Sequence, residues 1–297
     1  MATNKVNLDK EIVLIKKTNS TKIGQLQKFP QYKIEGGSGF ETVKIILQPK
    51  QSIRSNGGTM NFMTSNIIDS VKTRNKNNSF TKSFSSIVGR AFTGSSLFYN
   101  IFENIGENSG YLSLSTNIPG NVGTFYIPRG KELNIVSDSY ICSTTNLDVT
   151  GSVKLGGVLL GYGLVFINIK LKESSNHGND GLVWVGSLGH IFEHKLAPGE
   201  KVIVNNGVLL AFDSKVDINT YVIQGKNTGS TFKTFLFSGE GLISEVKNNT
   251  TETRTVYLQS RSKIFYNDYI KAVCNAEIDK TSSIKNAQGD FFSYAFS

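Results

Sequence analysis

One pattern occurs three times in this chain and limits the folds that it can adopt. An apolar entry, a proline turn and two short alternating runs make up LQPKQSIRSNGGTMNFM (47–63), IPRGKELNIVSDSYIC (127–142) and LAPGEKVIVNNGVLLAF (196–212). The chain has 5 prolines, and three of them lie in the turns of these stretches, within one residue of the same place: Pro49, Pro128 and Pro198. Alternation with a period of two is typical of β-strands, so we predict an internally repeated all-β protein with structural turns at these prolines.

The stretches align without gaps beyond the proline turn. One aligned column holds Ile53, Leu133 and Val202, and a later column holds Phe62, Cys142 and Ala211. Matching columns predict that each stretch contributes the same strands to its own unit.

A second alternating block follows each stretch, at YLSLS (111–115), LVWVG (182–186) and TVYLQ (255–259). Its even positions stack Leu112, Val183 and Val256, so we expect one apolar face for each strand. Trp184 points to the opposite face, either exposed at a partner surface or covered by a neighbouring strand, and we favour the covered position.

Basic residues are concentrated in the first third of the chain. Residues 1–90 hold 15 basic and 5 acidic side chains, whereas the remainder holds 17 and 18. The 28 asparagines are typical of AT-rich genomes, such as those of protists or large DNA viruses. The 2 cysteines, Cys142 and Cys274, are too few for a disulfide framework, and the column of Cys142 predicts a buried thiol in a reducing compartment.

No segment has the pattern of a signal peptide or of a membrane-spanning helix. The uncharged run between Lys154 and Lys170, which is rich in glycine and leucine, has 15 residues, and a spanning helix requires about 20. We therefore expect an intracellular protein that is soluble or peripheral to a membrane, with mitochondrial and virion-associated locations both left open.

Residues that could support catalysis are few. A metal site of the cupin kind needs two or three histidines and a carboxylate, and the chain offers His177, His190 and His194. The last two, four residues apart in a strand, would lie about 13 Å apart, too far to share one ion. No G-x-S-x-G motif activates a serine. The sequence predicts no enzyme, and no catalytic, metal-binding or cofactor-binding residues.

Cationic residues in the first unit could contact an anionic surface. The set consists of Lys72, Arg74, Lys76, Lys82 and Arg90, interleaved with Phe80 and Phe84. Cations and aromatic rings in alternation suit phosphate contact and base stacking, and the same cations could bind anionic lipid. A solvated loop is the alternative reading of this stretch.

The order of these motifs resembles one known family. A turn proline or Pro-Gly-Glu, the segment SSIVGRAFTGSSLFYNIF (85–102) and a glycine-rich run closing on VYLQS (256–260) are similar to the altered-inheritance-of-mitochondria protein twenty-four family, over about residues 31–262. Gln51-Ser52 departs from the Gly-Glu of that pattern, and Ser95 stands where an acidic residue is frequent. Fungal members are tied to the organisation of the mitochondrial inner membrane.

The resemblance implies a particular architecture. Family members look like three fused copies of a shortened double-stranded β-helix or β-sandwich unit, related to the tryptophan RNA-binding attenuation protein and arranged as a pseudo-trimer. We accordingly expect a basic arm (1–30), a three-repeat β domain (31–262) with at most one or two short helices, and a C-terminal tail (263–297). The three units cover about 31–125, 126–193 and 194–262, with strands shared across the boundaries.

Two functional hypotheses follow from these observations. The first is a non-enzymatic scaffold that acts through protein or membrane-surface contacts, with protein partners expected and a homo-oligomer left open. The alternative is a polyanion-binding protein that holds nucleic acid through its basic N-terminal third, for example as a component of a large DNA virus.

Overall fold

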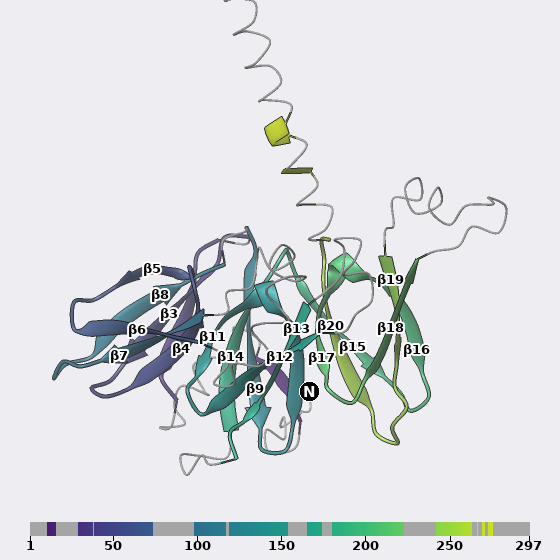
Figure 1. The fold of residues 1–297 in the computed structure, drawn as a ribbon, viewed down its shortest axis with the longest axis horizontal. Coiled ribbons are helices and arrows are strands. Elements are labelled where there is room, and N and C mark those ends of the chain that lie inside the picture. The colour runs from purple at the N-terminus through teal and green to yellow at the C-terminus, as the bar shows by residue number, and fades with distance from the viewer. Residues whose placement is uncertain are drawn as a thin grey trace, which may run out of the picture.

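Antiparallel strands form almost all of the part of the chain that the computed structural model describes. That part comprises residues 11–15, 29–37, 39–73, 98–116, 119–153, 165–173, 180–222, 242–262, 266, 269–270 and 273–275. Within these ranges, short 3-10 turns occur at η2 (Ser137–Ser139) and η4 (Asn206–Val208), and helical residues occur at 266, 269–270 and 273–275. The all-β prediction is therefore confirmed (Figure 1).

The described strands form three groups of six, preceded by β1 (Val13–Ile15) and β2 (Gln31–Glu35). The first group comprises β3 (Thr42–Leu47), β4 (Ser52–Asn56), β5 (Met60–Met63), β6 (Ile67–Thr73), β7 (Phe98–Asn104) and β8 (Gly110–Leu114). The second comprises β9 (Asn121–Pro128), β10 (Glu132–Val136), β11 (Tyr140–Thr144), β12 (Leu147–Val153), β13 (Val165–Leu171) and β14 (Asp180–Ser187). The third comprises β15 (Ile191–Leu196), β16 (Lys201–Asn205), β17 (Leu209–Asp213), β18 (Asp217–Val222), β19 (Leu242–Lys247) and β20 (Arg254–Gln259).

The same antiparallel pairings occur in each group. The sixth strand lies between the first and the third, as in β3–β8–β5, β9–β14–β11 and β15–β20–β17. The fifth strand lies between the second and the fourth, as in β4–β7–β6, β10–β13–β12 and β16–β19–β18. A register shift recurs in the third strand of each group, between Met60 and Phe62, Tyr140 and Cys142, and Leu209 and Ala211. The aligned columns of the sequence thus have the same pairing partners in space.

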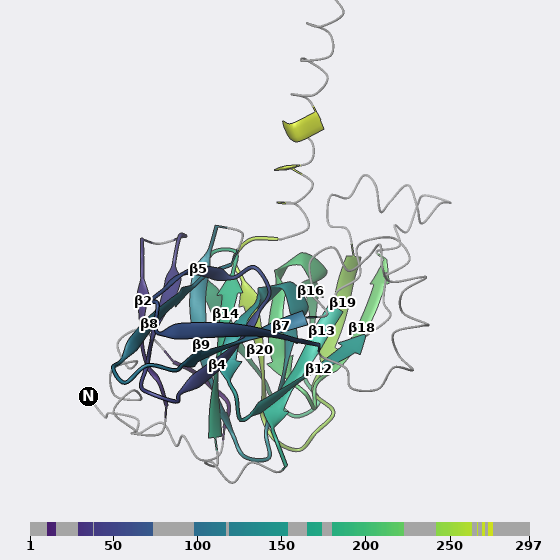
Figure 2. The ribbon, with the colours of Figure 1, turned by 60° about the vertical axis from the view of Figure 1, so that its left-hand side comes forward.

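Strand pairing joins consecutive groups at two seams in the described structure. At the first seam β4 pairs with β11, and at the second β10 pairs with β17. The result is a seven-stranded sheet in the order β1-β9-β14-β11-β4-β7-β6 and a six-stranded sheet in the order β12-β13-β10-β17-β20-β15. The three groups thus form a row. A four-stranded sheet, β2-β3-β8-β5, lies at one end of this row and a three-stranded sheet, β16-β19-β18, at the other. Figures 1 and 2 show these two sheets on opposite sides of the molecule.

The proline turns connect the first and second strands of each group. Pro49 and Pro198 lie between strands, and Pro128 is the last residue of β9. A residue with positive φ follows each proline closely: Lys50 (66°), Gly130 (79°) and Gly199 (78°). Glycine adopts this left-handed conformation without a steric cost, whereas a lysine pays for its Cβ, so the first turn is the strained one.

Buried apolar side chains from both faces of the central strands form the core. Cys142 is fully buried, as its column predicts, and Trp184 is fully buried too, which agrees with the covered position that we favoured for it. The expectation of one apolar face for each strand is wrong for β14, where both Val183 and Trp184 are 0% exposed. β14 lies inside the seven-stranded sheet and is covered on both faces, so alternation of side chains does not lead to alternation of burial there.

The N-terminal segment adds strands to two sheets. β1 pairs with β9 through Val13↔Tyr126, and β2 pairs with β3 through Gln31↔Ile46. The expected basic arm thus contains a strand over Val13–Ile15, and this strand pairs within its own chain. None of the described helical residues form a segment that is long and apolar enough to cross a membrane.

Candidate functional site

The predicted cationic contact residues are only partly described by the structure. Lys72 is exposed on β6, near the end of that strand. The other four, Arg74, Lys76, Lys82 and Arg90, lie outside the described residues. A cationic site in the described structure centres on Arg54, which is not in the set predicted from the sequence.

Arg54 is an arginine buried at the first seam. It lies on β4, is 8% exposed, and places its guanidinium over the ring of Tyr99, 4.6 Å from the centroid. Its backbone carbonyl accepts a hydrogen bond from the hydroxyl of Tyr140 on β11, at 3.3 Å. Its Nε is buried without a hydrogen-bond partner, and among the described residues no carboxylate forms an ion pair with it. A buried cation without a counter-ion is costly, which makes Arg54 a candidate for binding an anion.

Two lysines lie near Arg54. Lys72 pairs directly across from Tyr99, whose ring stacks on the guanidinium. Lys172 follows β13, and its Nζ donates a 2.5 Å hydrogen bond to the carbonyl of Thr145. The pKa of Lys172 is lowered, first by burial and then by the positive charges of Arg54 and Lys72, whereas Asp148 opposes the shift. We call Arg54, Lys72, Lys172 and Tyr99 the basic seam.

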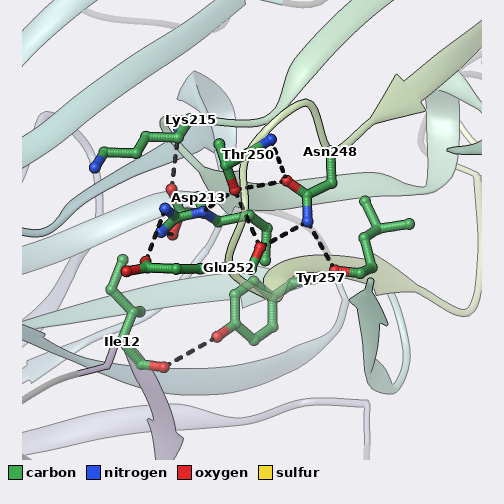
Figure 3. A network of polar contacts seen from close by, with 9 residues as sticks. Ile12, Asp213, Lys215, Asn248, Thr250, Glu252 and Tyr257 are labelled. Carbon is green, nitrogen blue, oxygen red and sulfur yellow. Dashed lines mark hydrogen bonds and ion pairs between the residues drawn. The ribbon is translucent and has the colours of Figure 1, made fainter. Parts of the chain in front are cut away.

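A second buried arginine, Arg254 on β20, has a full set of partners (Figure 3). Its guanidinium contacts Asp213 at 3.2 Å and Glu252 at 2.9 Å, and its Nε donates to the hydroxyl of Thr250 at 3.0 Å. The side chain is 4% exposed, so these partners compensate a charge that water does not reach.

The turn beside Arg254 is built around a buried asparagine. The amide of Asn248 donates to the carbonyls of Leu196 and Glu252, and its Oδ1 accepts from the backbone N–H and the hydroxyl of Thr250 (Figure 3). Asn104 makes equivalent bonds to Leu47 and Asn108 in the first group. This repetition indicates a structural network, because every polar group in it is satisfied within the chain.

Tyr257 completes the polar region shown in Figure 3. Its hydroxyl donates a 3.5 Å hydrogen bond to the carbonyl of Ile12, and its ring packs edge-on against Phe125. Burial raises the pKa of Tyr257, and the negative charges of Glu193 and Asp213 raise it further. A phenol that holds its proton so firmly fits a structural role at the N-terminal strand.

The residues considered for metal binding or nucleophilic chemistry lie apart. His194 is 3.8 Å from Glu200, and the ring of His190 packs edge-on against Phe192, while His177 lies outside the described residues. The described residues contain no group of three or more His, Cys, Asp or Glu side chains placed to hold a metal ion. Burial raises the pKa of the Cys142 thiol well above its usual value, which keeps it protonated.

Apolar side chains are exposed on the two strands that end the row. Phe62 and Met60 on β5 are 51% and 44% exposed, and Ile203 on β16 is 53% exposed. In the described structure each of these strands has one pairing partner and one open edge. We call β5 and β16 the open edges.

Sequence reasoning missed both surfaces, for different reasons. Arg54 follows Ile53 of an apolar column and therefore points to the opposite face of β4, a signal that was present in the sequence. The open edges had no such signal, because β5 and β16 belong to the same aligned pattern as strands that are covered.

Comparison with known proteins places this architecture. A crystal structure of a protein from Streptococcus pyogenes matches with a TM-score of 0.59 at 18% sequence identity, over 82% of this chain and 100% of that one. This structural match, at so low an identity, shows a shared fold alone. No match was found among curated proteins. The model of one family, described as mitochondrial biogenesis AIM24, matches residues 32–261. Since that match covers more than half of the 297 residues, the chain belongs to the mitochondrial biogenesis AIM24 family.

Proposed function

We propose that this protein is a non-enzymatic scaffold in mitochondrial biogenesis that binds other proteins through its open edges. Its family supplies the cellular process and favours a mitochondrial location. The open edges supply a surface of a kind that protein partners recognise, namely unpaired backbone N–H and C=O groups beside exposed apolar side chains.

We infer that the three groups of strands are copies of one shortened double-stranded β-helix unit, fused into a pseudo-trimer whose units stand side by side in a row. The shared pairings, the recurring register shift and the aligned columns support this inference. The relation to the tryptophan RNA-binding attenuation protein rests on the family resemblance alone.

The exposure of apolar residues on the open edges carries the scaffold proposal. Phe62 and Ile203 each leave about half of their surface in water, on strands without charged side chains apart from Lys201. Native proteins usually protect edge strands with charges, prolines or bulges. Here the protection is slight, namely Lys201 on β16 and the register shift between Met60 and Phe62 on β5, and an apolar edge of this kind is typical of a site that a partner covers.

Crosslinking in native cells tests the proposal. The chain would be expressed as wild type and as a Phe62→Asp/Ile203→Asp variant, crosslinked, recovered and analysed by mass spectrometry. Val71→Asp is the matched control, because Val71 is 63% exposed on another edge strand, β6. We expect mitochondrial proteins to be recovered with the wild type and the control and lost at least about tenfold with the edge variant. Recovery that is equal for all three chains would contradict the proposal.

A second function, binding of polyanions, is favoured by the basic seam. Among the described residues no carboxylate forms an ion pair with the buried Arg54, whose charge adds to those of two lysines, and a phosphate group would supply a counter-charge. The contact would involve few phosphates, so binding to single-stranded nucleic acid should weaken with salt at a shallow slope, about −0.7 for each phosphate neutralised.

Fluorescence anisotropy with a labelled single-stranded oligonucleotide tests this second function. We expect an Arg54→Met/Lys72→Met variant to bind at least about tenfold more weakly at low salt and with a smaller salt slope. Lys201→Met on β16 is the control, since it removes an exposed positive charge far along the chain. Equal affinity of the variant and the wild type would exclude the basic seam as a polyanion site.

A further inference from the structure

We propose that the partner at the open edges is a second copy of this chain, with β16 of one copy added antiparallel to β5 of the next. This inference rests on the proposed scaffold function, since the same two edges carry both. It goes further by naming the occupant, the direction and the register of the contact.

Both seams within the chain use one kind of strand pair. The second strand of the first group, β4, pairs with the third strand of the second group, β11. The second strand of the second group, β10, pairs with the third strand of the third group, β17. Two strands of these classes are left over in the described structure, the second strand of the last group (β16) and the third strand of the first group (β5). The chain therefore ends in two edges that match each other.

The register of the two seams is also the same. Ser55 pairs with Cys142 at the first seam, and Ile135 pairs with Ala211 at the second. Ser55 and Ile135 share their aligned column with Val204, and Cys142 and Ala211 share theirs with Phe62. Continuing the pattern pairs Val204 with Phe62 and Ile203 with Met63 of the next copy.

Burial differs between covered and open members of the same columns. Cys142 and Ala211 are both 0% exposed, whereas Phe62 in the same column is 51% exposed. Arg54, in the column of Ile203, is 8% exposed, whereas Ile203 is 53% exposed. The largest apolar side chains of these two columns thus occur where the chain itself provides no cover. Burying them against a second copy removes apolar area from water.

The combined sheet would reproduce one that already exists in the chain. Joining β5 to β16 gives the order β2-β3-β8-β5-β16-β19-β18. This order corresponds strand for strand to the sheet β1-β9-β14-β11-β4-β7-β6, including the extra N-terminal strand at one edge.

A contact between two different edges is heterologous. An open row of copies then keeps one free β5 edge at one end and one free β16 edge at the other until it closes into a ring, and it grows with concentration. Either product contains more than one copy, and blocking either edge alone prevents both.

Light scattering of purified protein tests the contact. We expect wild type to have at least twice the chain mass of 32.6 kDa, and Phe62→Asp and Ile203→Asp each to have the mass of one chain. Val71→Asp on β6, 63% exposed, should associate like wild type. The urea midpoint of each variant, unchanged from wild type, shows that the fold is intact.

Mixing the two blocked variants tests the direction. Phe62→Asp keeps an intact β16, and Ile203→Asp keeps an intact β5, so an equal mixture should form a dimer that cannot grow. Symmetric pairing of β5 with β5, or of β16 with β16, would instead leave one variant associated on its own. Any one of three results would overturn the inference. They are association of one variant on its own, a mixture that stays at 32.6 kDa, and a wild type that is a monomer at its highest soluble concentration.

Cysteine crosslinking tests the register. In a Cys274→Ser background, Met63→Cys and Ile203→Cys chains are expected to form an intermolecular disulfide, because directly paired residues lie within disulfide reach. The control pair, Met63→Cys with Lys201→Cys, is displaced by two residues and should crosslink at least about tenfold more slowly. If self-association fails while native partners are still lost with the edge variant, the scaffold proposal stands and the second copy is excluded.

Discussion

Two buried arginines in this protein differ in the groups that contact their charge. Arg254 in the third group contacts Asp213, Glu252 and the hydroxyl of Thr250. Arg54 in the first group has the ring of Tyr99 over its guanidinium and a buried Nε without a partner. Both side chains are removed from water, so burial alone does not distinguish them. The difference lies in what neutralises the charge.

This difference separates a structural cation from a candidate binding cation. Arg254 links β20 to β17 and to the turn around Asn248, and its charge is compensated within the chain. Arg54 lies at the first seam near Lys72 and Lys172, and these positive charges repel one another. Among the described residues no carboxylate offsets the buried charge of Arg54, which makes Arg54 a candidate for contact with an anion from outside the chain.

The largest expected effect is that of Arg254→Met on stability. Methionine removes the guanidinium and leaves Asp213 partly buried without its counter-ion, which should lower the free energy of unfolding by about 3 kcal/mol. Urea unfolding followed by fluorescence of Trp184 measures the loss. Lys201→Met removes half of an exposed pair with Glu245 and should cost less than about 1 kcal/mol. Equal losses in the two variants would contradict a structural role for Arg254.

A smaller loss is expected for Thr250→Val. The hydroxyl accepts the Nε–H of Arg254 at 3.0 Å and lies 2.8 Å from Oδ1 of Asn248. Valine preserves the shape but leaves that N–H and one lone pair of the asparagine unpaired, at a cost of about 1 to 2 kcal/mol. The double variant with Arg254→Met should lose less free energy of unfolding than the sum of the two single losses, because both changes disrupt one network. Full additivity would show that the network does not act as a unit.

Arg54→Met is expected to change stability little. The variant loses the contact with the Tyr99 ring, worth about 0.5 to 1 kcal/mol, and relieves an uncompensated charge of similar or greater cost. We expect a change of less than about 1 kcal/mol in the free energy of unfolding, of either sign. A loss as large as that of Arg254→Met would mean that Arg54 is structural, and it would remove the argument for an anion at the basic seam.

Parts of the fold could be predicted from single residues. The column of Cys142 predicted a buried thiol, a covered position was favoured for Trp184, and both are fully buried. Residues of one column have the same spacing from the other residues of their unit. Strand geometry then gives them equivalent pairing partners. Exposure of Phe62 could not be predicted in this way. Its column is apolar throughout, and only the order of the strands in space shows that β5 ends the row.

The two arginine environments were beyond sequence reasoning for a related cause. Asp213 and Arg254 are 41 residues apart, and Arg54 and Lys172 belong to different groups. Alternation indicates which face of a strand a side chain occupies, but it does not indicate what packs against that face. Charge counts drew attention to the stretch from Lys72 to Arg90, whereas burial, which only the packed sheets define, identifies Arg54.

The smallest effect, and the most direct probe of the basic seam, is the pKa of Lys172. Burial lowers it first and the charge of Arg54 lowers it next, so Arg54→Met should raise it toward the ordinary value of 10.5, while Lys215→Met, in another group, should not. The folded chain holds this proton less firmly than the unfolded chain. The free energy of unfolding therefore rises with pH between the folded pKa and 10.5, and this rise should shrink in Arg54→Met. NMR titration of the lysine side chain measures the pKa directly, and a pKa that is the same with and without Arg54 would show that the two cations do not face each other.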